Sequence, residues 1–161
     1  MKQGFKFIYS LFATMLTAYI CSIFTQIGIN EWYNGVEKPF LTPPNIVFTV
    51  AWSILYVLIM MSTFMVLRDA DSYSRKKANN LFIFQLFLQI LWCFTFFAQG
   101  HLCLGFAILL LLDACVFTMI VVYAKANKLA SYMLYPYYWW LLYATIMNFN
   151  FVYKYGFVMV L

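Results

Sequence analysis

Residues 7–30, FIYSLFATMLTAYICSIFTQIGIN, contain no charged side chain, and the same is true of residues 39–67 and 129–153. From Ala78 to Ala124, the only ionisable side chains other than Cys and Tyr are His101 and Asp113. A helix of about 20 apolar residues crosses the hydrocarbon core of a bilayer, which is roughly 30 Å thick. The whole chain is 66% hydrophobic and 9% charged, whereas soluble domains average about 45–50% and about 25%. The sequence therefore predicts an integral, multi-pass protein whose first partner is the lipid bilayer.

The apolar runs predict an all-α fold with five transmembrane helices, at residues 5–28, 45–67, 81–98, 102–124 and 134–155. The apolar stretch from 81 to 124 is too long for one helix, and the turn residues Gln99-Gly100-His101 divide it into a hairpin. Helices are expected because long uniform runs satisfy their backbone groups internally only in that form. Strands of a membrane barrel would instead alternate apolar and polar residues. We expect one domain over residues 1–161.

The basic residues gather at the ends of the apolar runs and indicate an orientation. Five spans put eight Lys and Arg residues on the side of the amino terminus, and leave only Lys38 and Lys154 on the other. Cytoplasmic loops are enriched in bases, so the amino terminus is predicted to be cytoplasmic. Bases so placed are expected to meet lipid phosphate, and we predict no nucleic-acid partner. The four cysteines lack metal-site spacing, so no metal site is predicted.

The first loop, residues 32–44, holds three of the four prolines. Proline restricts its own φ and the residue before it, so this segment loses little freedom on ordering. Two interpretations stay open, an interfacial loop at headgroup depth and a stiff lid over a cavity. The spans also contain Trp52, Trp92 and Trp140, whose indole N–H groups need a partner in hydrocarbon. That partner is either the packed protein or a ligand.

Four motifs, in order along the chain, identify a resemblance. The pattern WYxxLxKPxxTPP is matched by Trp32-Tyr33, Lys38-Pro39 and Thr42-Pro43-Pro44, and VFxxVWxxLY by Val47-Phe48, Trp52 and Leu55-Tyr56. The pattern QLxLNxxWSxxFF is matched by Gln85-Leu86, Trp92 and Phe96-Phe97, and PYxxWxxxAxxLN by Pro136-Tyr137, Trp140, Ala144 and Asn148. Over residues 32–148 the chain resembles the TspO/MBR family of tryptophan-rich sensory proteins and translocator proteins.

The resemblance implies a five-helix bundle that forms a homodimer and has a ligand pocket beneath the first loop. It implies porphyrin binding by residues at the matching positions, which are Tyr33, Pro43, Pro44, Trp52, Gln89, Trp92, Trp140, Ala144 and Asn148. Two departures from the family pattern matter for the site. Gln89 replaces an Asn, which moves the amide one methylene further out, and Leu41 replaces a loop Trp, which removes ring area and an N–H donor.

Three functions are weighed on these grounds. The first is a membrane receptor or carrier for tetrapyrroles such as protoporphyrin IX and for other flat hydrophobic ligands, with no required cofactor and the porphyrin as ligand. The second is an enzyme that degrades porphyrin with light and oxygen, in which Trp52 and Trp140 would be the catalytic residues; no other catalytic residue is assigned. The third is a transporter, for which Asp113 is the only intramembrane carboxyl group. The sequence leaves open whether the membrane is bacterial or organellar.

Overall fold

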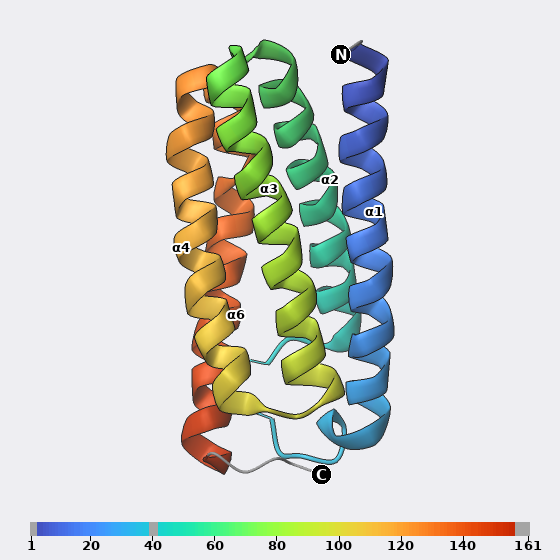
Figure 1. Ribbon diagram of the computed structural model, residues 1–161. Helices are drawn as coiled ribbons and strands as arrows, with labels where there is room; N and C mark the ends of the chain where they lie inside the picture. Colours follow the sequence, from blue (N-terminus) through green and yellow to red (C-terminus); the bar gives the residue numbers. More distant parts are fainter. Residues whose placement is uncertain (1–2, 39–41, 157–161) are drawn as a thin grey trace.

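The charge-free runs fold into long helices that stand side by side (Figure 1). The structure is a computed structural model that describes residues 3–38 and 42–156, and no strand occurs among them. The long helices are α1 (Gln3–Gly28), α2 (Asn45–Asp69), α3 (Ser72–Cys93), α4 (Leu102–Ala126) and α6 (Tyr135–Tyr155), and a short α5 (Lys128–Met133) precedes the last. The predicted all-α class is confirmed.

Four of the described helical segments are long and apolar enough to cross a membrane. Two of these segments are α2 and α4, and the other two are α1 and α3, each together with the π-helical turn that follows it. Helix α6 is not among them because its many Tyr, Trp and Asn residues lower its mean hydropathy. Its 21 residues nevertheless make a rod about 31 Å long, which packs against α4 within the bundle. The chain is therefore an all-α, multi-pass membrane protein with five long helices.

The long helices begin and end where the charge pattern predicts, with one exception. Helix α1 starts at one end of the bundle and α6 finishes at the other, so the described bases divide between the two ends as expected (Figure 1). The exception is α3, which begins at Ser72, well before the apolar run that starts at Leu81. The Asp71 carboxylate accepts hydrogen bonds from the backbone N–H groups of Tyr73 and Ser74. This N-cap starts the helix in hydrophilic sequence. Which end faces the cytoplasm stays a prediction.

Two helices finish in a π-helical turn at the end of the bundle near the first loop. Turn η1 (Ile29–Tyr33) extends α1, and η2 (Phe94–Ala98) extends α3. Trp32 and Tyr33, which the sequence placed in the loop, therefore lie on η1 instead. Gly100 follows η2 with a φ of 63°, a left-handed conformation that favours glycine. The predicted break at residues 99–101 is confirmed.

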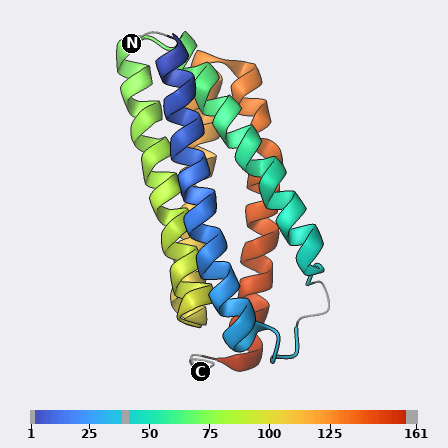
Figure 2. The ribbon, with the colours of Figure 1, turned by 90° about the vertical axis from the view of Figure 1, so that its right-hand side faces the viewer.

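The two π-helical turns are joined by close contact. The indole Nε1 of Trp32 donates a hydrogen bond of 2.8 Å to the carbonyl oxygen of Phe97. Nearby, Gly28 lies so close to Phe97 that a β-carbon on it would approach the Phe97 carbonyl oxygen to 2.6 Å and its α-carbon to 2.8 Å. The absence of a side chain at Gly28 thus lets α1 and η2 meet. On its other side, α1 lies beside α2, and the two helices are further apart at the end near the first loop (Figure 2).

Substitution of Gly28 by Ala is expected to destabilise the bundle, because the new methyl group meets backbone that cannot rotate away. Overpacking of this kind costs about 1–3 kcal/mol. The measurement is the thermal unfolding midpoint of the purified protein in detergent. Gly4→Ala is the matched control, since nothing lies within 4 Å of a β-carbon there. Equal midpoints for the two variants would show that α1 and η2 can separate freely.

Candidate functional site

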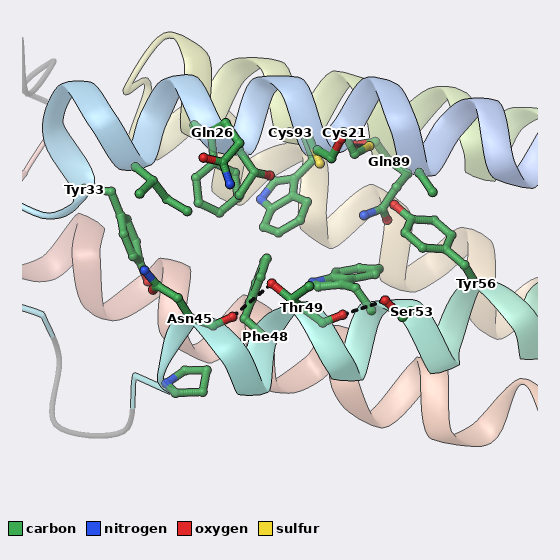
Figure 3. Close-up of a pocket in the computed structure, with 18 residues that line it drawn as sticks. Cys21, Gln26, Tyr33, Asn45, Phe48, Thr49, Ser53, Tyr56, Gln89 and Cys93 are labelled. Carbon is green, nitrogen blue, oxygen red and sulfur yellow. Dashed lines mark hydrogen bonds between the residues drawn. The ribbon is translucent and has the colours of Figure 1, made fainter.

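The main cavity of the described structure lies between α1, α2 and α3 (Figure 3). Its volume is about 230 Å³. Five residues predicted to bind ligand line it: Tyr33, Pro43, Trp52, Gln89 and Trp92. The structure thus brings these residues together from η1, the first loop, α2 and α3, while their role as ligand contacts stays a prediction.

A smaller cavity of about 40 Å³ lies against α6. It is lined by Trp140, Ala144 and Asn148, and it shares Tyr33, Pro43 and Trp92 with the main cavity. Of the predicted ligand-binding residues, only Pro44 lines neither cavity. Pro44 is exposed and stands at the N-cap of α2, where a missing N–H donor has no cost.

The side chain of Phe48 lines both cavities, as Tyr33, Pro43, Trp92 and Phe97 also do. Its ring centroid lies 6.1 Å from that of Trp52 on one side and 6.5 Å from that of Trp140 on the other. Phe48 also contacts Phe97 at 6.0 Å, so aromatic rings fill the wall. Trp52 and Trp140 thus lie on opposite sides of the Phe48 ring.

The tryptophans of the main cavity are buried and lack hydrogen-bond partners. Trp52 is 6% exposed and Trp92 is 3% exposed, and their ring centroids lie 6.0 Å apart at 35°. Neither indole Nε1 has a partner among the described residues, and the same is true of Trp140. An unpaired donor in a dry interior is costly, so these three groups remain available to a ligand acceptor.

A hydrogen-bonded chain of side chains fixes Gln89 at the cavity wall. The Gln85 amide donates to the hydroxyl of Tyr137 at 2.8 Å, and that hydroxyl donates to Oε1 of Gln89 at 3.2 Å. All three residues are buried. The Gln89 side chain thus contacts the Tyr137 hydroxyl on α6 and also lines the main cavity.

Two further polar groups lie between α4 and α6. Asn148 is 2% exposed, and neither atom of its amide has a partner among the described residues. Thr145 donates a hydrogen bond of 2.8 Å to Asp113, the intramembrane carboxyl group that the sequence singled out. Asn148 therefore offers a donor and an acceptor to the small cavity, whereas Asp113 lines neither cavity. Among the described residues, no three His, Cys, Asp or Glu side chains could together hold a metal ion.

The first loop is attached to the end of α6. Nζ of Lys154 lies 2.6 Å from a carboxylate oxygen of Glu37, and the Tyr155 hydroxyl donates to the Glu37 carbonyl at 2.8 Å. The hydrogen bond and charge of Lys154 lower the pKa of Glu37. The ion pair therefore contributes fully above the ordinary Glu pKa of about 4.3 and is lost as the pH falls through the lowered value.

Sequence reasoning missed several residues that line the main cavity. Phe48, Tyr56 and Phe97 are aromatic positions that resemble ordinary packing residues in a chain so rich in aromatic side chains. A second group is polar and comes from α1 and α2: Ser22, Thr25, Gln26, Asn45, Thr49 and Ser53. Asn45, Thr49 and Ser53 recur every four residues within an apolar span, and this spacing was a signal available in the sequence.

Comparison with known proteins agrees with this architecture. A profile of the TspO/MBR family matches residues 9–154, which is nearly the whole chain.

The chain belongs to the TspO/MBR family.

Named relatives of the family come from distant organisms. The chain is 37% identical to "Tryptophan-rich protein TspO" of Archaeoglobus fulgidus, over 89% of this chain and 93% of the relative. It is 32% identical to "Protein CrtK" of Rhodobacter capsulatus, over 88% and 90%. Identity to the human "Translocator protein" is 27%, over 85% and 82%. The resemblance noted in the sequence is thereby confirmed, while the homodimer that it implies stays a prediction. Leu41, the other departure from the family pattern, lies outside the described residues.

Removal of both contacts between α6 and the first loop is expected to loosen the loop. The double variant Lys154→Met/Tyr155→Phe loses the ion pair and the hydroxyl donor but keeps the apolar bulk of both side chains. The backbone amides of residues 34–38 should then exchange hydrogen faster at neutral pH, as measured by mass spectrometry. Lys125→Met/Tyr132→Phe makes equivalent changes at the opposite end of the bundle. If both variants exchange like the wild type, the loop does not depend on α6.

Proposed function

We propose that this TspO/MBR membrane protein is a receptor or carrier that binds tetrapyrroles, such as protoporphyrin IX, against its tryptophans. The observation that carries the proposal is the pair Trp52 and Trp92, which bound the main cavity with buried rings and unpaired N–H groups. A porphyrin is a flat apolar macrocycle with carboxylates along one edge. Indole faces offer it contact area, and indole N–H groups offer hydrogen bonds to acceptors.

The ammonium group of Lys38, near the first loop, suits the acidic edge of such a ligand. Nζ of Lys38 lies 4.8 Å from the ring centroid of Tyr33, and Tyr33 lines both cavities. A carboxylate that emerges beside Tyr33 would therefore meet a positive charge at the mouth of the site. This arrangement favours a ligand whose rings lie inside the bundle and whose carboxylates point toward the loop.

The size of the site requires a movement on binding. Ligand pockets usually enclose about 300–1,000 Å³, whereas the main cavity has about 230 Å³ and the small one about 40 Å³. Phe48 borders both cavities, and it is only partly buried. We infer that a macrocycle displaces the Phe48 ring and occupies both cavities, which would bring Trp52 and Trp140 onto the same ligand.

Loss of Trp140 is expected to weaken porphyrin binding roughly tenfold, because stacking of a flat ring on an aromatic side chain contributes about 1–3 kcal/mol. The measurement is quenching of tryptophan fluorescence on titration with protoporphyrin IX. Trp139→Ala is the matched control for Trp140→Ala, since the neighbouring Trp139 is 66% exposed and lines neither cavity. Both variants lose one of the five tryptophans. Equal affinities in the two variants would contradict the proposed site.

The same titration, repeated under illumination, separates binding from degradation. With a receptor or carrier, the absorbance of the saturated porphyrin complex does not fall during illumination. Loss of absorbance that disappears in Trp52→Phe or Trp140→Phe would instead support a light-dependent porphyrin-degrading enzyme.

A further inference from the structure

The main cavity reaches the surface of the bundle between α1 and α2. A residue that lines the cavity and is also exposed marks such a place, and this description fits Ser22 and Gln26 on α1 and Asn45, Thr49 and Ser53 on α2. Thr25 lines the same edge and is half-buried. These six residues are called the lateral opening below. By contrast, the deeper lining residues Trp52, Tyr56 and Trp92 are buried.

The lateral opening is polar in a region of the chain that should face lipid. The three polar residues of α2, from Asn45 to Ser53, span about 12 Å along the helix at 1.5 Å per residue. They therefore reach from the first residue of α2 inward, past the headgroup region. Its neighbours Val50 and Ile54 are exposed apolar residues, as a lipid-facing surface requires. Polar side chains at such depth are uncommon and usually face a cavity or a bound partner.

The hydrogen-bonding groups of the lateral opening differ in how they are used. The hydroxyls of Thr49 and Ser53 donate to backbone carbonyls one turn earlier on α2, which leaves them as acceptors. The amides of Gln26 and Asn45 bond to no described residue. Figure 3 shows Gln26 extending from α1 and Asn45 from α2 at the end of the cavity nearest Tyr33. Two free amides thus flank one end of the opening.

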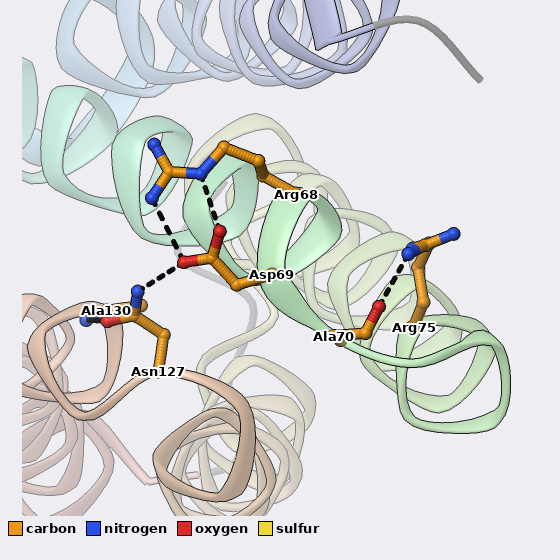
Figure 4. A network of polar contacts seen from close by, with 6 residues as sticks. All are labelled: Arg68, Asp69, Ala70, Arg75, Asn127 and Ala130. Carbon is orange, nitrogen blue, oxygen red and sulfur yellow. Dashed lines mark hydrogen bonds and ion pairs between the residues drawn. The ribbon is translucent and has the colours of Figure 1, made fainter.

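On its other sides, the described residues around the cavity are held by contacts. Toward the first loop, the ring of Tyr33 packs on Phe97 and Phe151 at 5.7 and 5.8 Å, and Glu37 ties the loop to α6. Toward the opposite end, α2 is held firmly. Asp69 at its end accepts from Arg68 and from Asn127 (Figure 4), and Ser62 donates to the carbonyl of Ala130.

We propose that ligands reach the main cavity sideways from the bilayer, through the lateral opening, and that Gln26 and Asn45 bind the polar edge of the ligand there. This inference rests on the proposed function, because it concerns the same cavity and the same flat, amphipathic class of ligand. Such ligands dissolve in the bilayer, so a route through the side of the bundle avoids the aqueous loop entirely. The amides supply both donors and acceptors, which suits a carboxyl, hydroxyl or carbonyl group.

The route is tested by the rate of quenching when proteoliposomes are mixed with protoporphyrin IX. Ser53→Phe narrows the opening, and Ile54→Phe adds a ring at the adjacent exposed position outside the cavity. Narrowing should slow both association and dissociation about tenfold, a barrier increase of about 1.4 kcal/mol. If protoporphyrin IX leaves the Ser53→Phe variant faster than the wild type, the new phenyl ring occupies the cavity itself, and this result contradicts the proposal.

A third variant tests the competing route past the loop. Glu37→Gln removes the ion pair with Lys154 and should leave the quenching rate unchanged if ligands arrive from the side. Faster quenching in Glu37→Gln, or equal rates in Ser53→Phe and Ile54→Phe, overturns the lateral route while saturable quenching still supports the proposed function. Absence of saturable quenching in the wild type overturns both.

The role of the two amides is tested with a matched pair of porphyrins. Mesoporphyrin carries two carboxylates, and etioporphyrin has ethyl groups in their place. Gln26→Leu/Asn45→Leu should weaken mesoporphyrin binding about tenfold, as expected for two hydrogen bonds of about 0.5–1.5 kcal/mol each, and leave etioporphyrin binding unchanged. Asn80→Leu, an exposed amide on α3 that lines neither cavity, is the control. Equal loss for both porphyrins would contradict a polar subsite.

Discussion

Hydrocarbon offers no hydrogen-bond partners, and this constraint governs where the bundle is closely joined and where it is hollow. In the packed part of the bundle, several buried polar groups pair across helices: the hydroxyl of Thr63 with that of Tyr123 at 3.1 Å, and Ser131 with the carbonyl of Ile120 at 2.9 Å. At the cavities, three indole N–H groups and the Asn148 amide have no partner in the described protein. Single atoms of Thr14, Arg75, Gln85 and Asp113 are also unpaired and lie outside the cavities. The cavities therefore hold the larger share, though not all, of the unmet hydrogen-bonding capacity.

Much of the fold was predictable because charge is excluded from the membrane interior. The charge-free runs located α1, α2, α4 and α6 to within a few residues. The start of α3 was missed because an N-cap, Asp71, begins the helix in hydrophilic sequence, and hydropathy does not report capping. The π-helical turn that carries Trp32 was also missed, since it depends on a contact with Phe97, which lies 65 residues away along the chain.

The candidate site was predictable in its residues but not in its shape. The motifs pointed to Trp52, Trp92 and Trp140, and the structure places all three on cavity walls. Side chains that border both cavities, Phe48 among them, shape the division into two, and side-chain conformations of this kind leave no mark in a sequence. The polar row on α2 did leave one, as a four-residue repeat of Asn, Thr and Ser within an apolar run.

The asymmetric fastening of α2 has a consequence for the range of guests that the protein can hold. A stiff helix that is hydrogen-bonded to its neighbours near Ser62, and held near Asn45 by ring contacts such as those of Phe48, would act as a lever about 26 Å long. A tilt of only about 5° would then shift its tip by about 2 Å over that length, roughly the difference between a thin ring system and a substituted one. The far end of the bundle need not repack. Tolerance of guests of different thickness can thus arise from geometry alone, with selectivity left to the few polar atoms that the guest must satisfy.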